Sequence, residues 1–184
     1  MDDTGLQLND ELWQPKLASA PPRRIHSERI MTLEHLYLSP AHNFIGHHGQ
    51  EPGDSPMVEA DAIECVAGRG IRGDRFFDFK KDFKGQITFF SMEVYEVVCA
   101  KFGMSDLAPS VFRRNVLVRG ADLNTFIGCE FDIQGIRFLG TQEAAPCHWM
   151  DRVVAKGAEK ALLGNGGLRA KILSDGLLRR GVMK

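Results

Sequence analysis

The sequence predicts a mostly β, α+β domain in which an antiparallel β-barrel carries a few inserted helices. Short apolar or alternating segments bounded by Gly, Pro, Ser and Asp recur from residue 30 to residue 184, as in strands joined by turns. Few segments have the periodicity of a helix. Strands and helices do not alternate regularly, which favours an antiparallel arrangement over a parallel one.

The length and composition are those of an ordinary globular protein. The 184 residues favour one domain with its own core, and 43% of them are apolar and 26% charged. No segment approaches the roughly 20 apolar residues of a membrane helix. The acidic start, MDDTGLQLND, is unlike a signal peptide. We therefore expect a cytoplasmic protein that does not contact a membrane.

The net charge of −1 conceals an asymmetry along the chain. Residues 101–184 carry 13 Lys and Arg against 8 Asp and Glu, a net charge of +5, so residues 1–100 carry −6. A basic C-terminal part is compatible with an anionic ligand, although solvated surface charge explains most imbalances of this size. With a total charge near zero, nucleic acid is not expected as a partner.

The first half of the chain predicts a loose N-terminal segment followed by short strands. Residues 1–29 have little apolar periodicity and are expected to form a tail or extension. Strands are predicted over residues 30–38, 58–66 and 86–90. Between the first two, residues 41–56 form a long loop rich in Gly, Pro and His, and such loops often carry function.

The middle of the chain predicts one long helix and a hairpin. Ser91 is suited to cap the helix and Gly103 to end it. The helix would bury the face formed by Met92, Tyr95, Cys99 and Phe102. A strand follows over residues 114–118, and then the segments CEFDI and IRFLG form a hairpin joined at Gln134-Gly135.

The C-terminal part predicts two short helices and a final hairpin. Apolar residues have helical spacing over residues 147–156, and AEKALLG indicates one or two further turns. The segment LRAKILSDGLLRRG contains Ser-Asp-Gly between two apolar runs, which is typical of a hairpin.

The four cysteines form no C-x-x-C pair, which argues against a zinc knuckle and a disulfide framework. Cys65, Cys99 and Cys129 lie at predicted strand or helix positions, and we expect them to pack. Cys147 follows Pro146 at a predicted helix start, where proline is favoured. The free N–H groups and the helix dipole there favour a thiolate that can attack or bind metal. The alternative is a small buried apolar residue.

Histidines provide weaker signals. His148, beside Cys147, is either a base or ligand or an exposed residue at the helix start. His42, His47 and His48 lie in the long loop, and with Cys147 they could form a zinc site, although their spacing is irregular.

Three segments combine glycines with arginines, which permits close approach of the backbone to a phosphate or a flat ring. None matches a Walker A or G-x-G-x-x-G motif, and each alone is equally consistent with a turn that faces water. The segments are GRGIRGDRFF with Arg72, Asp74 and Arg75, FRRNVLVRG with Arg113, Arg114 and Asn115, and LLGNGGLRAK with Arg169.

Four segments, taken in their order along the chain, resemble the MOSC domain, which is named for the C-terminal part of molybdenum cofactor sulfurases. They are YLSP, GRGIRGDRFF, the block from RRNVLVRG to EAAPC, and GGLRAKILSDGLLRRG. The likeness runs over residues 30–184. It implies a β-barrel, in agreement with the strand count. It also implies the molybdenum cofactor, a molybdopterin, with the metal held by one cysteine thiolate that matches Cys147.

The resemblance also implies roles for the basic segments. Arg114 and Asn115 best match the family motif, and Arg75 and Arg169 follow, so these residues would face the pterin and its phosphate. Asp74 and Arg72 belong to the same predicted cofactor side. Glu143 could orient a ligand or transfer a proton, or be a surface residue at a strand end.

Two features depart from the larger members of the family. The residue before the cysteine is Pro146, where amidoxime-reducing members commonly have arginine, and residues 1–29 are not expected to form the extra N-terminal β-domain of those members. The chain is therefore closer to the small bacterial type, and substrate preference cannot be transferred from the larger proteins.

The function implied first is molybdenum-dependent reduction of N-hydroxylated small molecules, with Cys147 on the metal and Glu143 or His148 as proton source. Because the sequence has no flavin, haem or iron-sulfur motif, electrons would come from a separate donor protein. One alternative is a sulfur carrier, in which Cys147 holds a persulfide received from a sulfur donor. Another is a non-catalytic cofactor-binding module. At the level of the family, pyridoxal phosphate is a further ligand to consider.

Overall fold

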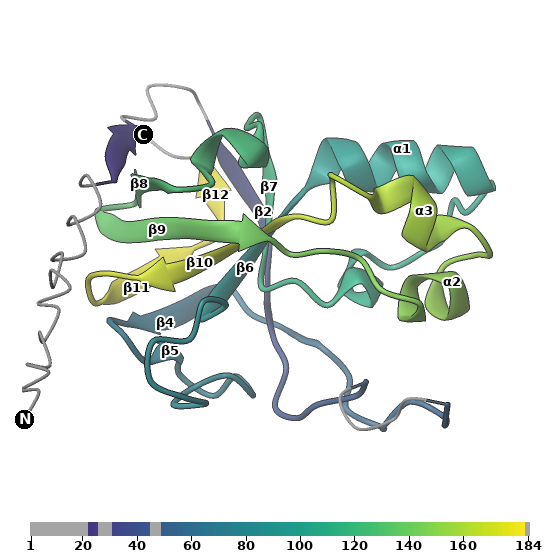
Figure 1. Cartoon of the computed structure of the whole chain (residues 1–184), viewed down its shortest axis with the longest axis horizontal. Helices are drawn as coiled ribbons and strands as arrows, with labels where there is room; N and C mark the ends of the chain where they lie inside the picture. Colours follow the sequence, from purple (N-terminus) through teal and green to yellow (C-terminus); the bar gives the residue numbers. More distant parts are fainter. Residues whose placement is uncertain (1–21, 26–30, 45–48, 183–184) are drawn as a thin grey trace, which may run out of the picture.

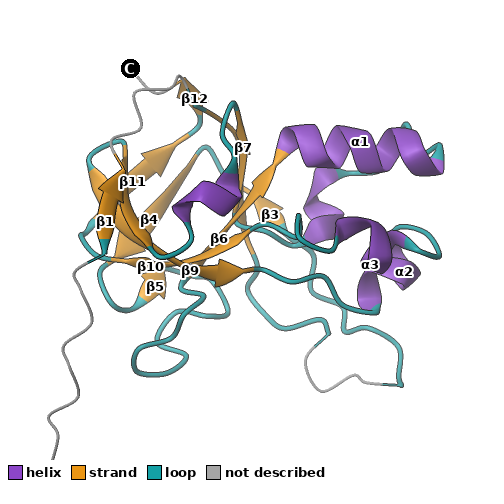
Figure 2. Cartoon of the chain, turned by 45° about the horizontal axis from the view of Figure 1, so that its top comes forward, coloured by secondary structure: helices purple, strands orange, loops and turns teal. Residues whose placement is uncertain are grey.

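The computed structural model of the chain describes residues 22–25, 31–44 and 49–182. Within these residues, strands form two sheets, and the α-helices lie together on one side of them (Figures 1 and 2). The helices are α1 (Met92–Phe102), α2 (Trp149–Val153) and α3 (Ala158–Leu162), with short 3₁₀ helices η1 (Pro109–Phe112) and η2 (Leu123–Phe126).

The larger sheet has the strand order β1-β8-β9-β10-β6-β7-β2-β12, with β3 paired to β2. The smaller sheet has the order β11-β4-β5. The strands of the larger sheet are β1 (Arg23–Ile25), β2 (Thr32–Leu38), β3 (Val58–Glu59), β6 (Ile87–Ser91), β7 (Val116–Arg119), β8 (Cys129–Ile133), β9 (Ile136–Glu143), β10 (Leu168–Ile172) and β12 (Gly181–Val182). Those of the smaller sheet are β4 (Ala62–Val66), β5 (Gly70–Ile71) and β11 (Gly176–Arg179).

The sheet is open and mixed, so the prediction of a closed antiparallel barrel is wrong. Strands β6 and β7 run parallel, with Phe89 opposite Val116, and β1 and β8 are also parallel. Among the described residues, the end strands β1 and β12 do not pair with each other. The parallel pair is possible because α1 carries the chain back across the sheet between β6 and β7. The mostly β, α+β class is confirmed.

Helix α1 begins and ends where its sequence predicts. Ser91 Oγ accepts a hydrogen bond from the Val94 N–H at 3.2 Å, and Gly103 ends the helix in the left-handed conformation at φ 65°. The predicted apolar face is only partly correct, because Val98 is fully buried and Cys99 only half-buried.

The hairpin between β8 and β9 is confirmed, whereas the final hairpin is wrong. Gln134 and Gly135 both have positive φ, 51° and 78°, as a two-residue hairpin turn requires. At the C-terminus, β10 pairs with β9 and β6, but β11 pairs with β4 in the other sheet. The connecting turn binds neighbouring loops, since Asp175 Oδ1 accepts from the Ala67 N–H at 2.7 Å.

Other boundaries shift more modestly. The predicted strand over residues 58–66 is divided into β3 and β4, and the predicted helix over residues 147–156 forms only at Trp149–Val153. Arg23–Ile25, within the predicted N-terminal extension, pairs with β8, while most of that extension lies outside the described residues. The domain boundary near residue 30 stays a prediction.

Two buried clusters lie on opposite sides of β6. Phe89 packs against Phe131 and Phe138, with ring centroids 5.8 Å and 5.6 Å away, in the cluster between the strands. Phe90 stacks on Phe112 at 4.7 Å in the cluster beneath the helices. Adjacent strand residues face opposite sides, so β6 contributes to both clusters. In the part of the chain that the structure describes, no helix has the length and apolarity needed to cross a membrane.

The Gly140→Ala substitution tests how closely the backbones of β9 and η2 approach each other. A Cβ at this position would lie 2.1 Å from the backbone oxygen of Phe126, so Gly140→Ala must displace backbone. We expect this substitution to lower the free energy of unfolding in urea by about 2–3 kcal/mol. Gly135→Ala meets no atom within 4 Å, and only its positive φ is strained, so it should cost about 1 kcal/mol. Equal losses would contradict the steric explanation.

Candidate functional site

A cavity of about 360 Å³ lies where β6, β10 and the start of β7 meet the segment that follows β9. This volume is sufficient for a small ligand or part of a cofactor. The described residues place four guanidinium groups, one thiol and one imidazole in its wall. These belong to Arg75, Arg113, Arg114, Arg169, Cys147 and His42.

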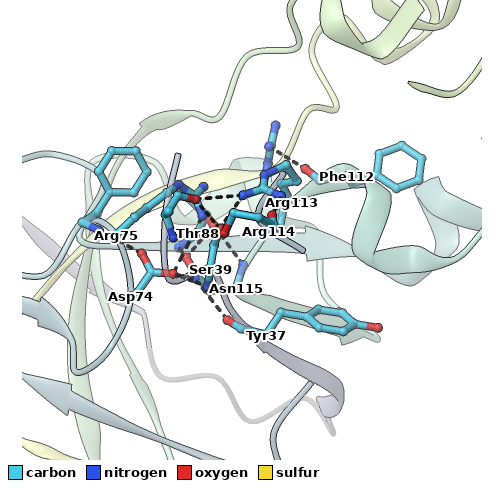
Figure 3. Close-up of polar contacts among 12 residues, drawn as sticks. Tyr37, Ser39, Asp74, Arg75, Thr88, Phe112, Arg113, Arg114 and Asn115 are labelled. Atoms are coloured by element: carbon cyan, nitrogen blue, oxygen red, sulfur yellow. Dashed lines mark hydrogen bonds and ion pairs between the residues drawn. The ribbon is translucent and has the colours of Figure 1, made fainter. Parts of the chain in front are cut away.

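The buried Asn115 side chain holds the framework beneath the cavity (Figure 3). Its Oδ1 accepts hydrogen bonds from the N–H and the hydroxyl of Thr88, at 3.1 and 2.8 Å. Its Nδ2 donates to the Tyr37 carbonyl at 3.2 Å and to Asp74 Oδ2 at 3.0 Å. The amide therefore joins β2, β6 and the turn that follows β5, and it does not line the cavity itself.

Asp74 is also a framework residue. Its buried carboxylate accepts hydrogen bonds from the backbone N–H groups of Ser39 and Phe76, both at 3.0 Å, as well as from Asn115. These contacts fix the turn that presents the next residue, Arg75, to the cavity. Asp74 and Asn115 were predicted to bind the cofactor. In the structure they do not line the cavity but support its wall from behind.

Arg75 has an unsatisfied group in the cavity wall. Its Nη1 is buried and, among the described residues, has no hydrogen-bond partner, since Asp74 Oδ2 lies 3.8 Å away. The guanidinium carbon lies 4.7 Å from the centre of the Phe76 ring. Burial lowers the pKa of Arg75. A buried donor without an acceptor is costly, so an acceptor that enters this part of the wall would be stabilising.

Arg113 fastens the long loop to the cavity wall. It caps the C-terminus of η1 directly after Phe112, in the left-handed region at φ 53°. Its guanidinium donates to the carbonyls of Ser55 and Ala41, at 2.8 and 3.2 Å, and to the Ser39 hydroxyl. Burial, and then the charge of Arg75, lower the pKa of Arg113 to about 10. The side chain remains a cation at neutral pH.

Arg114 joins three backbone segments around the cavity. It donates to the carbonyls of Gly166, Phe112 and Ala144, at 3.0, 2.8 and 2.7 Å. Burial, and then the charge of Arg169, lower its pKa to about 10, while Cys147 and Glu143 act in the opposite direction. The three carbonyl oxygens accept hydrogen bonds from the Arg114 guanidinium but do not neutralise its positive charge.

Cys147 is exposed at the edge of the cavity. Its carbonyl accepts from the Met150 N–H at 2.8 Å, so the residue lies in the turn that leads into α2. Gly166 allows this turn to approach closely, since a Cβ there would lie 2.5 Å from the Ala144 oxygen. With only five residues, α2 is too short for the predicted helix-dipole effect; the neighbouring cation is Arg114.

The remaining predicted residues have different positions. Arg169 lines the cavity. Glu143 is half-buried, and its Oε1 accepts from the Gly166 N–H at 3.0 Å. His148 is exposed, with its ring centre 4.9 Å from that of Trp149. Arg72 is exposed and pairs with Glu64 at 2.7 Å, so it does not reach the cavity.

Arg113 and His42 line the cavity, although neither was predicted to bind the cofactor. Arg113 was named only as part of the basic segment FRRNVLVRG, directly before Arg114, and His42 only as a ligand of zinc. Three phenylalanines of the segment FFDFKKDF also line the cavity, namely Phe76, Phe79 and Phe83. Their signal was the density of aromatic residues in an otherwise charged loop.

The zinc hypothesis finds no support in the described chain. Within residues 22–25, 31–44 and 49–182, no three His, Cys, Asp or Glu side chains are grouped closely enough to hold a metal ion. His47 and His48 lie outside these residues.

Comparison with known proteins identifies the family. The MOSC domain matches residues 47–182, and the chain therefore belongs to the MOSC domain family. No curated protein sequence matches the chain. The fold is similar to that of the YuaD protein from Bacillus subtilis, with a TM-score of 0.62 and 21% identity over 83% of this chain and 93% of that one.

Two further solved structures share the fold at lower identity. YiiM from Geobacillus stearothermophilus has a TM-score of 0.60 and 15% identity over 83% of this chain and 73% of that one. YiiM from Escherichia coli has a TM-score of 0.55 and 14% identity over 80% of this chain and 68% of that one.

The pKa of His42 responds to the positive charge in the cavity wall. Burial, and then Arg75, lower the pKa of His42 below its ordinary value, and Arg113 acts in the same direction. In NMR titrations we expect a midpoint below about 6.5, which rises when pyrophosphate binds, because an anion would offset the two guanidiniums. The His42→Gln variant assigns the signal. A midpoint that does not respond to bound pyrophosphate would show that the cavity cations do not act on His42.

Proposed function

We propose that the chain binds the molybdenum cofactor in this cavity and reduces N-hydroxylated compounds, with Cys147 as the thiolate ligand of the metal. The observation that carries the proposal is an exposed thiol beside four guanidinium groups, one of which has a buried nitrogen without an acceptor. Membership of the MOSC family supports the choice of cofactor, because MOSC domains are associated with it.

The residues fit such a group on chemical grounds. The cofactor carries a phosphate, and guanidinium groups bind phosphate through paired, charge-assisted hydrogen bonds. Arg75 has an unused donor for this purpose, and Arg169 lines the same wall. A deprotonated cysteine is a suitable ligand for a soft transition metal. Arg113 and Arg114 would mainly hold the wall in place, since their donors already bind carbonyls and a hydroxyl.

Held by Cys147 and the arginines of the wall, the cofactor would supply two-electron oxygen-atom transfer chemistry. The overall reaction breaks the N–O bond of R–NHOH, consumes two electrons and two protons, and releases R–NH₂ and water. The electrons come from a separate reduced donor protein. The protons must be delivered inside the cavity, and His42 is the imidazole that lines it. We therefore assign the proton-donor role to His42, with Glu143 and His148 as the competing candidates.

The Cys147→Ala variant tests the metal ligand. Produced in a host that makes the cofactor, the unmodified protein should contain molybdenum, and the variant should lose almost all of it because no thiolate remains in the cavity. Elemental analysis measures this directly. The matched control is Cys99→Ala, which removes a half-buried thiol from α1 and should retain the metal. Full molybdenum content in Cys147→Ala would refute the proposal.

The His42→Gln variant tests the proton donor. With a chemical reductant, kcat should fall by about 100-fold while KM and molybdenum content change little. In the loaded protein, kcat should decrease as the pH rises through the pKa of His42, since the protonated form is the donor; the anionic cofactor would offset the guanidiniums that lower this pKa in its absence. This dependence should vanish in the variant. If Glu143→Gln or His148→Gln shows these effects instead, the assignment to His42 is wrong.

The alternative functions predict other results in the same preparations. A sulfur carrier would show a mass increase of one sulfur atom on Cys147 and no molybdenum. A binding module would contain the cofactor without turnover when reductant and N-hydroxylated substrates are supplied.

A further inference from the structure

One side of the cavity is built from the rings of His42, Phe76, Phe79 and Phe83, which we call the aromatic wall. Phe76 is central, with its ring centre 4.9 Å from that of His42 and 5.3 Å and 5.0 Å from those of Phe79 and Phe83. The contacts are tilted or edge-to-face, as aromatic rings prefer. The wall is therefore a packed surface of rings that borders the cavity.

The aromatic wall is separate from the core of the protein. Phe76, Phe79 and Phe83 belong to neither of the two buried clusters, and Phe79 exposes 46% of its surface. The rings come from an otherwise charged loop, whose Lys80 lies over Phe79 and Phe83. Apolar surface that faces water in a cavity is unfavourable, and a ligand that covers it gains free energy.

Aromatic rings also occur on the α2 side of the cavity. Phe44 and Trp149 both line it, and their ring centres lie 4.7 Å apart. Small or compact residues, Ala144, Ala145 and Pro146, also line the cavity and connect the end of β9 to Cys147. The cavity thus combines aromatic surfaces with a thiol and cations in a single space.

From this arrangement we infer that the aromatic wall is a substrate subsite, which selects N-hydroxylated compounds that carry a planar aromatic ring; the inference rests on the proposed function. The guanidinium groups suit the anionic cofactor, whereas the aromatic wall consists of apolar rings and one imidazole, with the Lys80 ammonium over two of the rings. The half-exposed Phe79 indicates that the wall is open to water, as an exchangeable ligand requires. A planar ring makes offset-stacked or edge-to-face contacts with such a surface in addition to burying apolar area, whereas a saturated ring of similar size only buries area.

The test compares two amides that cannot be reduced, benzamide and cyclohexanecarboxamide. Their affinities are measured by the fluorescence of Trp149 in a Trp13→Phe background, which leaves one tryptophan. We expect benzamide to bind about fivefold more tightly, the effect of one aromatic contact of about 1 kcal/mol. Phe79→Leu, which keeps an apolar side chain without a ring, should reduce the preference, because the other rings of the wall remain, and Phe79→Trp should preserve it.

Turnover provides a second readout. With a chemical reductant, kcat/KM for benzohydroxamic acid over cyclohexanecarbohydroxamic acid should show the same preference and the same reduction in Phe79→Leu. Leu163→Ala, which changes an exposed apolar residue that is not in the cavity wall, should leave both ratios unchanged. Equal affinities in the unmodified protein, or an unchanged preference in Phe79→Leu, would overturn the inference.

Molybdenum content separates this inference from the proposed function. If Phe79→Leu loses molybdenum that the unmodified protein contains, the ring serves the cofactor and the inference is overturned. If the unmodified protein contains no molybdenum, the proposed function fails, whereas the amide affinities still show whether the wall selects planar rings.

Discussion

The side-chain amide of Asn115 is the contact on which the site depends. Its oxygen and nitrogen make four hydrogen bonds inside the protein, to Thr88, Tyr37 and Asp74. An amide has two donors and two acceptor positions, so its capacity is used completely. The contact holds two strands and a turn in one register, and that turn carries Arg75 into the cavity. Asn115 does not line the cavity, yet its hydrogen bonds determine where the guanidinium group of Arg75 lies.

Three of the four guanidinium charges of the cavity are not paired with a carboxylate. Within the described chain, Arg113, Arg114 and Arg169 form no ion pair, and Arg75 forms one with Asp74 at 3.8 Å. Arg113 and Arg114 bind neutral oxygens instead, which fixes their positions but leaves the charge uncompensated. Crowding such cations in a partly buried space is unfavourable for the empty protein. An anionic ligand would reverse this effect, so the electrostatics favour an anionic ligand over a neutral one.

Local features were predictable from the sequence, and long-range pairings were not. The caps of α1 and the hairpin turn at Gln134-Gly135 depend only on residues close in the sequence. Both were therefore predicted correctly. The parallel pairing of β6 with β7, and the separation of β10 from β11 into two sheets, depend on contacts between distant segments. An antiparallel barrel was the simplest arrangement of short strands, and the chain adopts a different one.

The same distinction applies to the site. Cys147, Arg75, Arg114 and Arg169 were recognised through the family motif, and they all line one cavity. Asp74 and Asn115 belong to the same motif but support the wall from behind, a difference that only the three-dimensional arrangement shows. His42 and Phe79 come from loops whose position beside the cavity depends on Arg113 and on packing among the rings.

Anomalous diffraction at the molybdenum edge, from crystals of the protein loaded with the cofactor, tests the central claim most directly. The account predicts a molybdenum peak bonded to the sulfur of Cys147, with an oxygen of the cofactor phosphate within hydrogen-bond distance of Arg75 Nη1. A peak elsewhere in the molecule, or a loaded protein in which Arg75 Nη1 still has no partner, would contradict it.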